Sequence, residues 1–166
     1  MSEIKVFTTG GTIDDLEYSS EDEAPTNKGS LIPMLLRSAG VDVNYSIELL
    51  MNKDSKFITD EDRKIILDSC VTCESDRIVI THGTVTMVET ALYLQKQGLP
   101  KTIVLTGAMI PANQEGSDAA DNVKVAFAGA ESKPPGVYVA MTGQLFDAEN
   151  VRKNIEEGIF EELHSS

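Results

Sequence analysis

The stretch "RIVITHGTVTMVETALYLQKQG", residues 77–98, predicts a strand, a turn and a helix in direct succession. The run RIVI is β-branched and apolar, which is typical of a buried strand. The residues from 84 onward have the composition of a helix, and Gly98 ends it. Between the two lies "THGTVTM", residues 81–87, in which the hydroxyls of Thr84 and Thr86 flank Val85.

The same alternation continues in both directions along the chain. Strands or extended segments are expected at IKVFTT (4–9), VDVNYSIELLM (41–51), TIVLTG (102–107) and GVYVAM (136–141). Helices are expected at SLIPMLLRSAG (30–40), TDEDRKIILDSCVTC (59–73, with Thr59 as N-cap), DAADNVKVAFAGAES (118–132) and NVRKNIEEGIFEEL (150–163). Strands separated by helices predict an α/β domain with a mostly parallel sheet between two helical layers. We expect residues 1–166 to form one domain.

The charge balance argues against some classes of binding partner. The chain has 166 residues, a formal net charge of −13 and a pI near 4.4. Such a charge repels phosphate groups, which argues against nucleic-acid partners and against a polybasic membrane contact. The apolar runs are strand-sized and no basic-then-apolar signal peptide is evident, so the expected location is the cytoplasm.

Two sequence features are compatible with a metal or redox role but do not favour one. Cys70 and Cys73 form a single C-x-x-C, which is half a zinc site, and the chain has no second pair. They fall near the end of a predicted helix, where the dipole disfavours a thiolate, so ordinary helix residues are the favoured interpretation. Residues 14–30 form a long acidic loop, which is more typical of a solvated surface than of a metal site.

Small hydroxyl residues and glycines follow several predicted strands. The strand ends carry Thr9-Gly10-Gly11-Thr12, Lys53-Asp54-Ser55-Lys56, His82-Gly83-Thr84 and Thr106-Gly107-Ala108-Met109. Ligands of such sheets bind beyond the carboxyl ends of the strands, so these groups are expected to converge. The segment TGGT lacks the spacing of nucleotide-binding loops. A GGT after one strand alone favours a tight structural turn, but hydroxyl residues recur at several strand ends, which strengthens the case for a threonine nucleophile. The candidate activators are Tyr18, Lys53, Lys56 and Lys153. No G-x-S-x-G is present, and His82 is expected to be a hydrogen-bonded structural residue.

Five motifs, in order, resemble those of bacterial-type L-asparaginases. They are TTGGTID (8–14), KDSKFITDED (53–62), THGTVTM followed by VET (81–90), VLTGAMIP (104–111) and LFDAENVRK (145–153). The resemblance implies the three-layer fold of the family's N-terminal domain. It also implies hydrolysis of L-asparagine to L-aspartate and ammonia through an acyl-enzyme on threonine, without metal or cofactor.

The same resemblance implies roles for individual residues. Thr12 matches the nucleophile, Tyr18 its activator, and Thr84 with Lys153 the second half of the catalytic group. The implied substrate-binding residues are Gly11, Asp54, Ser55, Lys56, Gly83, Val85 and Ala108, the last through its backbone carbonyl. Family members associate, so a homodimer or higher homo-oligomer is expected.

Three departures from the family pattern bear on activity. The resemblance covers nearly all of this sequence but half of the usual family chain, so the C-terminal domain is expected to be absent. Lys56 stands where the family has Gln or Ser. Val85 stands where the family has the aspartate that binds the substrate's α-ammonium, and valine offers no acceptor. The alternative is therefore a weak or inactive amino-acid-binding or regulatory protein, or an engineered inactive variant. Val85 either faces the pocket or packs into the core.

Overall fold

The computed structural model of the chain describes residues 3–11, 13, 32–110 and 114–164. Its α-helices are α1 (Ile32–Ala39), α2 (Asp60–Thr72), α3 (Met87–Gln95) and α4 (Ala119–Ser132). Two 3-10 helices are η2 (Ser55–Phe57) and η3 (Ala148–Asn150). None of the helices in this part of the chain is long and apolar enough to cross a lipid bilayer.

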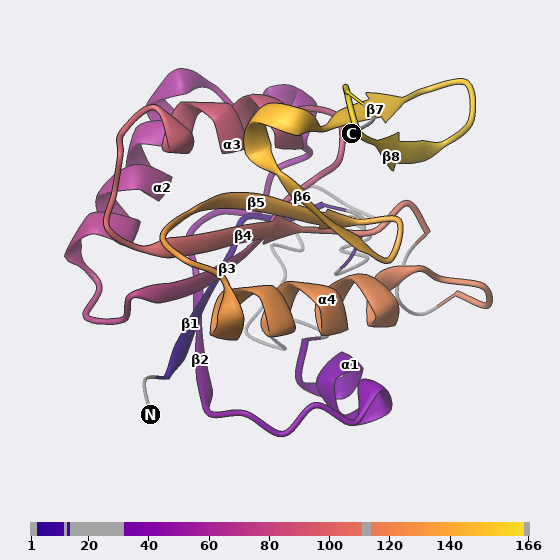
Figure 1. The fold of residues 1–166 in the computed structure, drawn as a ribbon, viewed down its shortest axis with the longest axis horizontal. Coiled ribbons are helices and arrows are strands. Elements are labelled where there is room, and N and C mark those ends of the chain that lie inside the picture. Colours follow the sequence, from indigo (N-terminus) through magenta and orange to yellow (C-terminus); the bar gives the residue numbers. More distant parts are fainter. Residues whose placement is uncertain (1–2, 12, 14–31, 111–113, 165–166) are drawn as a thin grey trace, which may run out of the picture.

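One sheet forms the centre of the molecule (Figure 1). Its strands are β1 (Ile4–Thr8), β2 (Tyr45–Leu49), β3 (Arg77–Thr81), β4 (Thr102–Thr106), β5 (Gly136–Met141) and β6 (Gln144–Asp147). They are ordered β2-β1-β3-β4-β5-β6, and all pairs are parallel except β5 with β6. The chain order reverses at β1, so the switch point of the sheet lies between β1 and β3. Thr8 is in register with Thr81, and Thr81 with Thr106, so these strands end level with one another.

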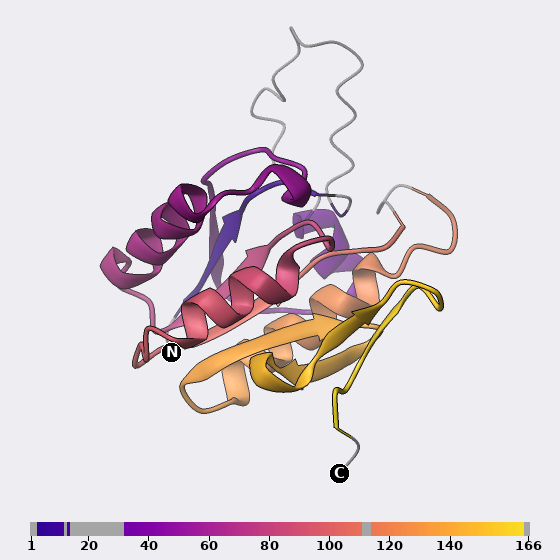
Figure 2. The same cartoon turned by 90° about the horizontal axis from the view of Figure 1, so that it is seen from above.

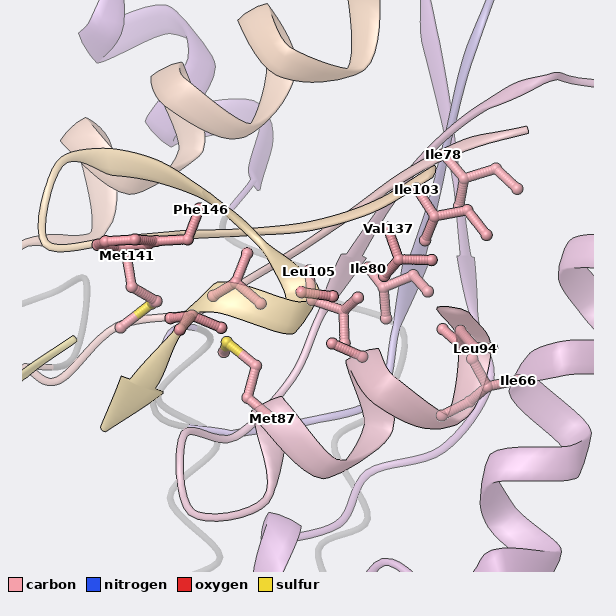
Figure 3. Close-up of a cluster of buried hydrophobic side chains, with 14 of the residues drawn as sticks. Ile66, Ile78, Ile80, Met87, Leu94, Ile103, Leu105, Val137, Met141 and Phe146 are labelled. Atoms are coloured by element: carbon pink, nitrogen blue, oxygen red, sulfur yellow. The ribbon is translucent and has the colours of Figure 1, made fainter. Parts of the chain in front are cut away.

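Both faces of the sheet are covered, which explains the continuous apolar strands. Helices α1 and α4 lie on one face, and α2 and α3 on the other (Figures 1 and 2). Figure 3 shows side chains of β3, β4 and β5 meeting those of α2 and α3, including Ile80, Leu105 and Met87. Val79 and Val104 point to the opposite face, where they pack with α4 residues such as Phe127. The predicted three-layer α/β fold is confirmed.

Helix α2 begins as the sequence predicts. The Thr59 hydroxyl accepts a hydrogen bond from the Asp62 N–H at 3.2 Å, and the Asp62 carboxylate accepts one from the Thr59 N–H at 3.0 Å. This capping box satisfies two donors that the first turn leaves unpaired. At the other end, burial raises the pKa of the Cys70 thiol to about 12, which makes it an inert thiol at neutral pH.

The last predicted helix, residues 150–163, is wrong. The structure has η3 followed by an antiparallel hairpin of β7 (Arg152–Asn154) and β8 (Ile159–Glu161). Val151, Ile155 and Ile159 are spaced as on a helix face, but Ile155 is 83% exposed and Phe160 is buried instead. Gly158, with φ of +67°, closes the turn by donating its N–H to the Asn154 carbonyl at 2.9 Å. The hairpin lies on the α3 side of the sheet, and β6, which the sequence analysis missed, leads into it (Figure 1).

Candidate active site

The carboxyl ends of β1 and β3 form the centre of the candidate site. The Thr81 carbonyl accepts hydrogen bonds from both the N–H and the hydroxyl of Thr9, at 3.2 and 2.7 Å. The Thr9 carbonyl in turn accepts one from the Lys53 N–H at 2.9 Å. The strand-end segments after β1, β2 and β3 are therefore bonded to one another at the switch point, where ligands of open α/β sheets bind.

Glycines allow these segments to approach closely. Gly11 has a φ of +98°, and a Cβ added there would lie 2.7 Å from the backbone nitrogen of Gly83. A Cβ added to Gly83 would lie 2.7 Å from the Ser55 hydroxyl. Since such distances are too short for carbon, only glycine permits the three-way contact. The predicted convergence of strand ends is thus confirmed for these three segments.

Thr12 and Tyr18, the proposed nucleophile and activator, lie outside the described residues. The residues on either side of Thr12 are described: Gly11 is half-buried, and Ile13 is fully buried against the α1 and α4 layer. The roles of Thr12 and Tyr18 stay predictions.

The segment after β2 supports the turn after β3. Asp54 caps η2 by accepting a hydrogen bond from the Lys56 N–H at 3.1 Å. Ser55 is 1% exposed, and its hydroxyl accepts from the Thr86 N–H at 3.2 Å. The Thr86 hydroxyl donates to the Ser55 carbonyl at 2.7 Å. Two bonds therefore fix the turn after β3 to η2, a supporting role for Ser55 that is separate from its predicted contact with substrate.

Thr84 and Lys153 are brought together although they lie 69 positions apart. The Lys153 Nζ donates a hydrogen bond to the Thr84 hydroxyl at 2.9 Å. Lys153 is on β7, so the hairpin that the sequence analysis mistook for a helix carries it to the β3 turn. An ammonium on a threonine hydroxyl stabilises the alkoxide form and leaves the hydroxyl proton free to be given up.

Val85 lies on the surface between these hydroxyl residues. Its side chain is 59% exposed, so the alternative in which Val85 packs into the core is wrong. Thr84 and Thr86 on either side are half-buried.

The basic residues near η2 are engaged with carboxylates. Lys53 Nζ is 2.8 Å from an Asp62 oxygen, and Lys56 Nζ is 3.8 Å from an Asp54 oxygen. Burial raises the pKa of the Asp62 carboxyl, but the hydrogen bonds and charge that it receives from Lys53 and Thr59 outweigh this and leave the pKa below its usual value. An ammonium held by an ionised carboxylate is a poor general base, which makes Lys53 a weak candidate activator.

His82 is fully buried and both of its ring nitrogens have partners. Nδ1 is 2.6 Å from the Gly83 carbonyl oxygen, and Nε2 is 2.8 Å from the Thr90 hydroxyl. Burial lowers the pKa of the imidazole to about 4, while the bond to the Gly83 carbonyl opposes this shift and Arg63 adds to it. The prediction of a structural, hydrogen-bonded histidine is confirmed.

The segment at the end of β4, residues 106–109, is held by the carboxylate of Asp118, which the sequence analysis did not single out. Asp118, at the start of α4, accepts hydrogen bonds from the N–H groups of Met109 and Ile110, each at 3.0 Å. Asn122 Nδ2 donates to Asp118 and to the Gly107 carbonyl, also at 3.0 Å. These bonds hold the backbone around Ala108, which is 1% exposed. The sequence signal for Asp118 was an acidic residue at the start of a predicted helix. In the structure, its carboxylate bonds to the loop that precedes the helix.

The described residues thus assemble four strand ends, a threonine–lysine pair and a neutral histidine at one edge of an α/β sheet. They contain no group of three or more His, Cys, Asp or Glu residues that could hold a metal ion. This arrangement defines the class: an α/β protein with a polar site of hydroxyls and backbone groups at the switch point.

Known proteins share this sequence pattern and this fold. The model of the family "Asparaginase, N-terminal" matches residues 3–159, and the chain belongs to the asparaginase family. It is 32% identical over 154 residues to an L-asparaginase of Thermococcus kodakarensis, covering 89% of this chain and 46% of the relative. A structure of the thermostable L-asparaginase from the same organism aligns with a TM-score of 0.77 and 29% identity over 99% of this chain and 52% of that one. A glutamyl-tRNA(Gln) amidotransferase component from Methanococcus vannielii is 30% identical over 178 residues, covering all of this chain and 40% of the relative. The chain therefore spans between 40% and 52% of the length of these relatives.

Proposed function

We propose that this chain is an amidohydrolase that converts L-asparagine to L-aspartate and ammonia with Thr12 as nucleophile. The observation that carries the proposal is the hydrogen bond from Lys153 to Thr84 beside the β1–β3 switch point. A lysine–threonine pair next to a glycine-bordered strand end provides the proton handling that amide hydrolysis needs. Family membership supports the amide-hydrolase class.

The proposed reaction has two steps. The Thr12 oxygen attacks the side-chain amide carbon and its proton passes by way of Tyr18 to the amide nitrogen; the carbon–nitrogen bond then breaks, ammonia leaves, and an acyl-threonine ester remains. Water then attacks the ester, restores the Thr12 hydroxyl and releases L-aspartate. Thr84, with its hydroxyl held by Lys153, orients the attacking water, and the proton that the water loses is taken up by the Thr12 oxygen as the ester bond breaks. Gly11, Asp54, Ser55, Lys56, Gly83, Val85 and Ala108 are the residues proposed to line the bound substrate.

The test is ammonia release from L-asparagine by the purified chain and by Thr12→Ala. Losing the covalent route should reduce kcat by about 10³ or more while the circular dichroism spectrum is unchanged. Thr72→Ala is a suitable control, because Thr72 is an exposed hydroxyl residue at the end of α2. Comparable kcat in Thr12→Ala and the parent would refute the assignment.

A second candidate function is binding of an amino acid without turnover. The exposed Val85 favours it, since a valine at the family's aspartate position offers no acceptor to the substrate's α-ammonium. In that case L-aspartate raises the melting temperature of a chain that releases no ammonia.

We also propose that the chain forms a homodimer or higher homo-oligomer and works in the cytoplasm. Ile155 in the hairpin turn is 83% exposed and Leu163 just after β8 is 48% exposed, which is apolar surface that a second copy of the chain would cover. Light scattering at micromolar concentration should give at least twice the 18.0 kDa of the single chain. A monomer under those conditions would contradict the association.

A further inference from the structure

A line of buried hydrogen bonds leads from the α2–α3 layer to the turn after β3. Arg63 Nε lies 3.0 Å from the Thr90 hydroxyl, the same hydroxyl lies 2.8 Å from His82 Nε2, and His82 Nδ1 lies 2.6 Å from the Gly83 carbonyl oxygen. His82 and Thr90 are fully buried and Arg63 is 7% exposed. Water therefore has little access to these groups, and the side chains of His82 and Thr90 must find their partners within the line.

The chemistry of the two ends fixes the direction of every bond. A carbonyl oxygen only accepts, so the ring proton is on Nδ1. A guanidinium only donates, so the Thr90 oxygen accepts from Arg63. The Thr90 hydroxyl proton is then directed to the lone pair of His82 Nε2. With these directions, each donor and acceptor in the line is satisfied by a neutral imidazole.

A protonated imidazole would disrupt this arrangement. Its Nε2–H would point at the Thr90 oxygen, so the Thr90 hydroxyl proton would lose the ring nitrogen as its acceptor. A second positive charge would also be buried beside Arg63, whose own partners, Asp60 and Glu89, have side chains that are 83% and 69% exposed. Burial, with Arg63 adding to it, thus favours the neutral ring, and Arg63 selects one of the two tautomers through Thr90.

We propose that His82 is a positioning residue for the candidate site: its Nδ1–H holds the Gly83 carbonyl toward the interior and thereby turns the Thr84 N–H toward the exposed side of the turn. The reason is geometric, because a planar trans peptide group places its C=O and N–H on opposite sides. No described residue accepts a hydrogen bond from the Thr84 N–H. A backbone N–H fixed in this way is suited to bind the oxygen on which negative charge develops during amide hydrolysis. This catalytic use rests on the proposed function, whereas the hydrogen-bond directions do not.

The tautomer can be observed directly by nuclear magnetic resonance. His82 and His164 are the two histidines of the chain, so a long-range 1H–15N spectrum contains two imidazoles, and His164→Gln assigns them. We expect His82 at pH 7 to show a protonated Nδ1 and an unprotonated Nε2. Thr90→Val, which removes the hydroxyl at nearly constant volume, should release this selection and shift the Thr84 amide signal, while Thr90→Ser should restore both.

Kinetics separate positioning from a merely structural role. Thr90→Val should lower kcat for L-asparagine about ten- to a hundredfold, as expected for a misdirected oxyanion donor. KM should stay within about twofold, because the interaction acts mainly in the transition state. Should Thr90→Val fail to fold, His82→Asn and His82→Gln give the same comparison. The Asn amide places an N–H near the position of Nδ1 and should retain more kcat than the Gln amide, which reaches toward Nε2.

Each outcome decides a part of the proposal. A protonated Nε2 in the parent chain would overturn the assignment of directions. An unchanged kcat in a folded Thr90→Val with an altered tautomer would overturn the positioning role. A parent chain with the expected tautomer and no ammonia release would overturn the proposed function and the catalytic use of the turn, and would support the hydrogen-bond directions.

Discussion

The turn after β3 and the C-terminal hairpin meet in a single hydrogen bond, from Lys153 to Thr84, but they are held in place in different ways. In the turn, residues 82–86, His82 and Gly83 are buried, and Ser55 and Thr90 bond to it from two sides. In the hairpin, Arg152 pairs with Glu161 at 2.8 Å on the surface, and Phe160 is the buried strand residue.

The difference indicates which of the two regions fixes the geometry of the threonine–lysine pair. Buried hydrogen bonds in a low dielectric are costly to break, whereas exposed ion pairs contribute little. The turn is therefore the fixed half of the threonine–lysine pair, and the hairpin is the half with lower local stability. Changes in the turn should affect stability and geometry together, and changes in the hairpin should affect activity with little effect on the fold.

Between these two regions, the largest expected effect comes from removing the lysine on the hairpin side. Lys153→Met keeps most of the side-chain volume but leaves the Thr84 hydroxyl without its cationic partner. In an active preparation kcat should fall by about 10³, the scale of a lost acid–base contribution. Thermal unfolding should change little, because the hairpin's buried contacts are kept.

Arg152→Met is the matched control, since Arg152 is the neighbouring cation on β7 and is 56% exposed in its pair with Glu161. Its kcat should remain near that of the parent. Equal losses in the two variants would show that the hairpin's overall charge, not the bond to Thr84, supports activity, and would remove the contrast between the two regions.

The buried His82 of the turn should make the free energy of unfolding depend on pH. The pKa of His82 is about 4 in the folded chain and near 6.5 when unfolded, so the unfolded state binds more protons between these values. Stability contributed by the neutral ring is fully present above about pH 6.5, is lost as the pH falls toward 4, and then levels off. The loss amounts to roughly 3 kcal/mol, at about 1.4 kcal/mol per pKa unit.

Urea unfolding between pH 7 and 4 measures this, and His82→Asn should flatten the curve over that window. The carboxyl groups of Asp62 and Glu161 also have pKa values below their usual values, so their contributions begin to fall near the bottom of this window, and the comparison with His82→Asn subtracts them. A parent curve that is already flat from pH 7 to 4 would contradict a buried neutral histidine.

The elements of the fold could be predicted because local and tertiary preferences agree in most of the chain. RIVI and TIVL are apolar throughout and become β3 and β4, buried on both faces. Thr59 caps α2 as its sequence position indicates. The hairpin was mispredicted because Val151, Ile155 and Ile159 imitate a helix face, while the burial of Phe160 and the turn at Gly158 determine the structure.

The site was predictable only in part. The motifs paired Thr84 with Lys153 through family resemblance, since nothing local connects residues 69 positions apart. The line from Arg63 through Thr90 to His82 had no signal in the sequence, because it depends on how α2 and α3 are rotated against the sheet. Residue patterns indicate which side chains are polar, but the packing of the helices decides which of them meet.

The smallest expected effect tests the residue at the exposed tip of the turn. Val85→Asp would place a carboxylate beside Thr84, where it can accept charge-assisted hydrogen bonds from a substrate ammonium. We expect kcat/KM for L-asparagine to rise at least about tenfold, which corresponds to about 1.4 kcal/mol. The melting temperature should change little, because Val85 is 59% exposed and a carboxylate there stays hydrated.

Val85→Asn separates charge from shape, since it matches aspartate in size and carries no charge. If the carboxylate acts by binding the ammonium, Asn should recover only a small part of the gain, and the gain with Asp should shrink as salt is added. If both variants improve activity equally, the valine side chain obstructs the substrate and its missing charge is irrelevant. If neither improves activity while the fold is intact, the exposed tip of the turn does not contact substrate. The functional part of the turn would then be confined to Thr84 and its buried supports, which would sharpen the contrast between the fixed interior of the turn and its surface.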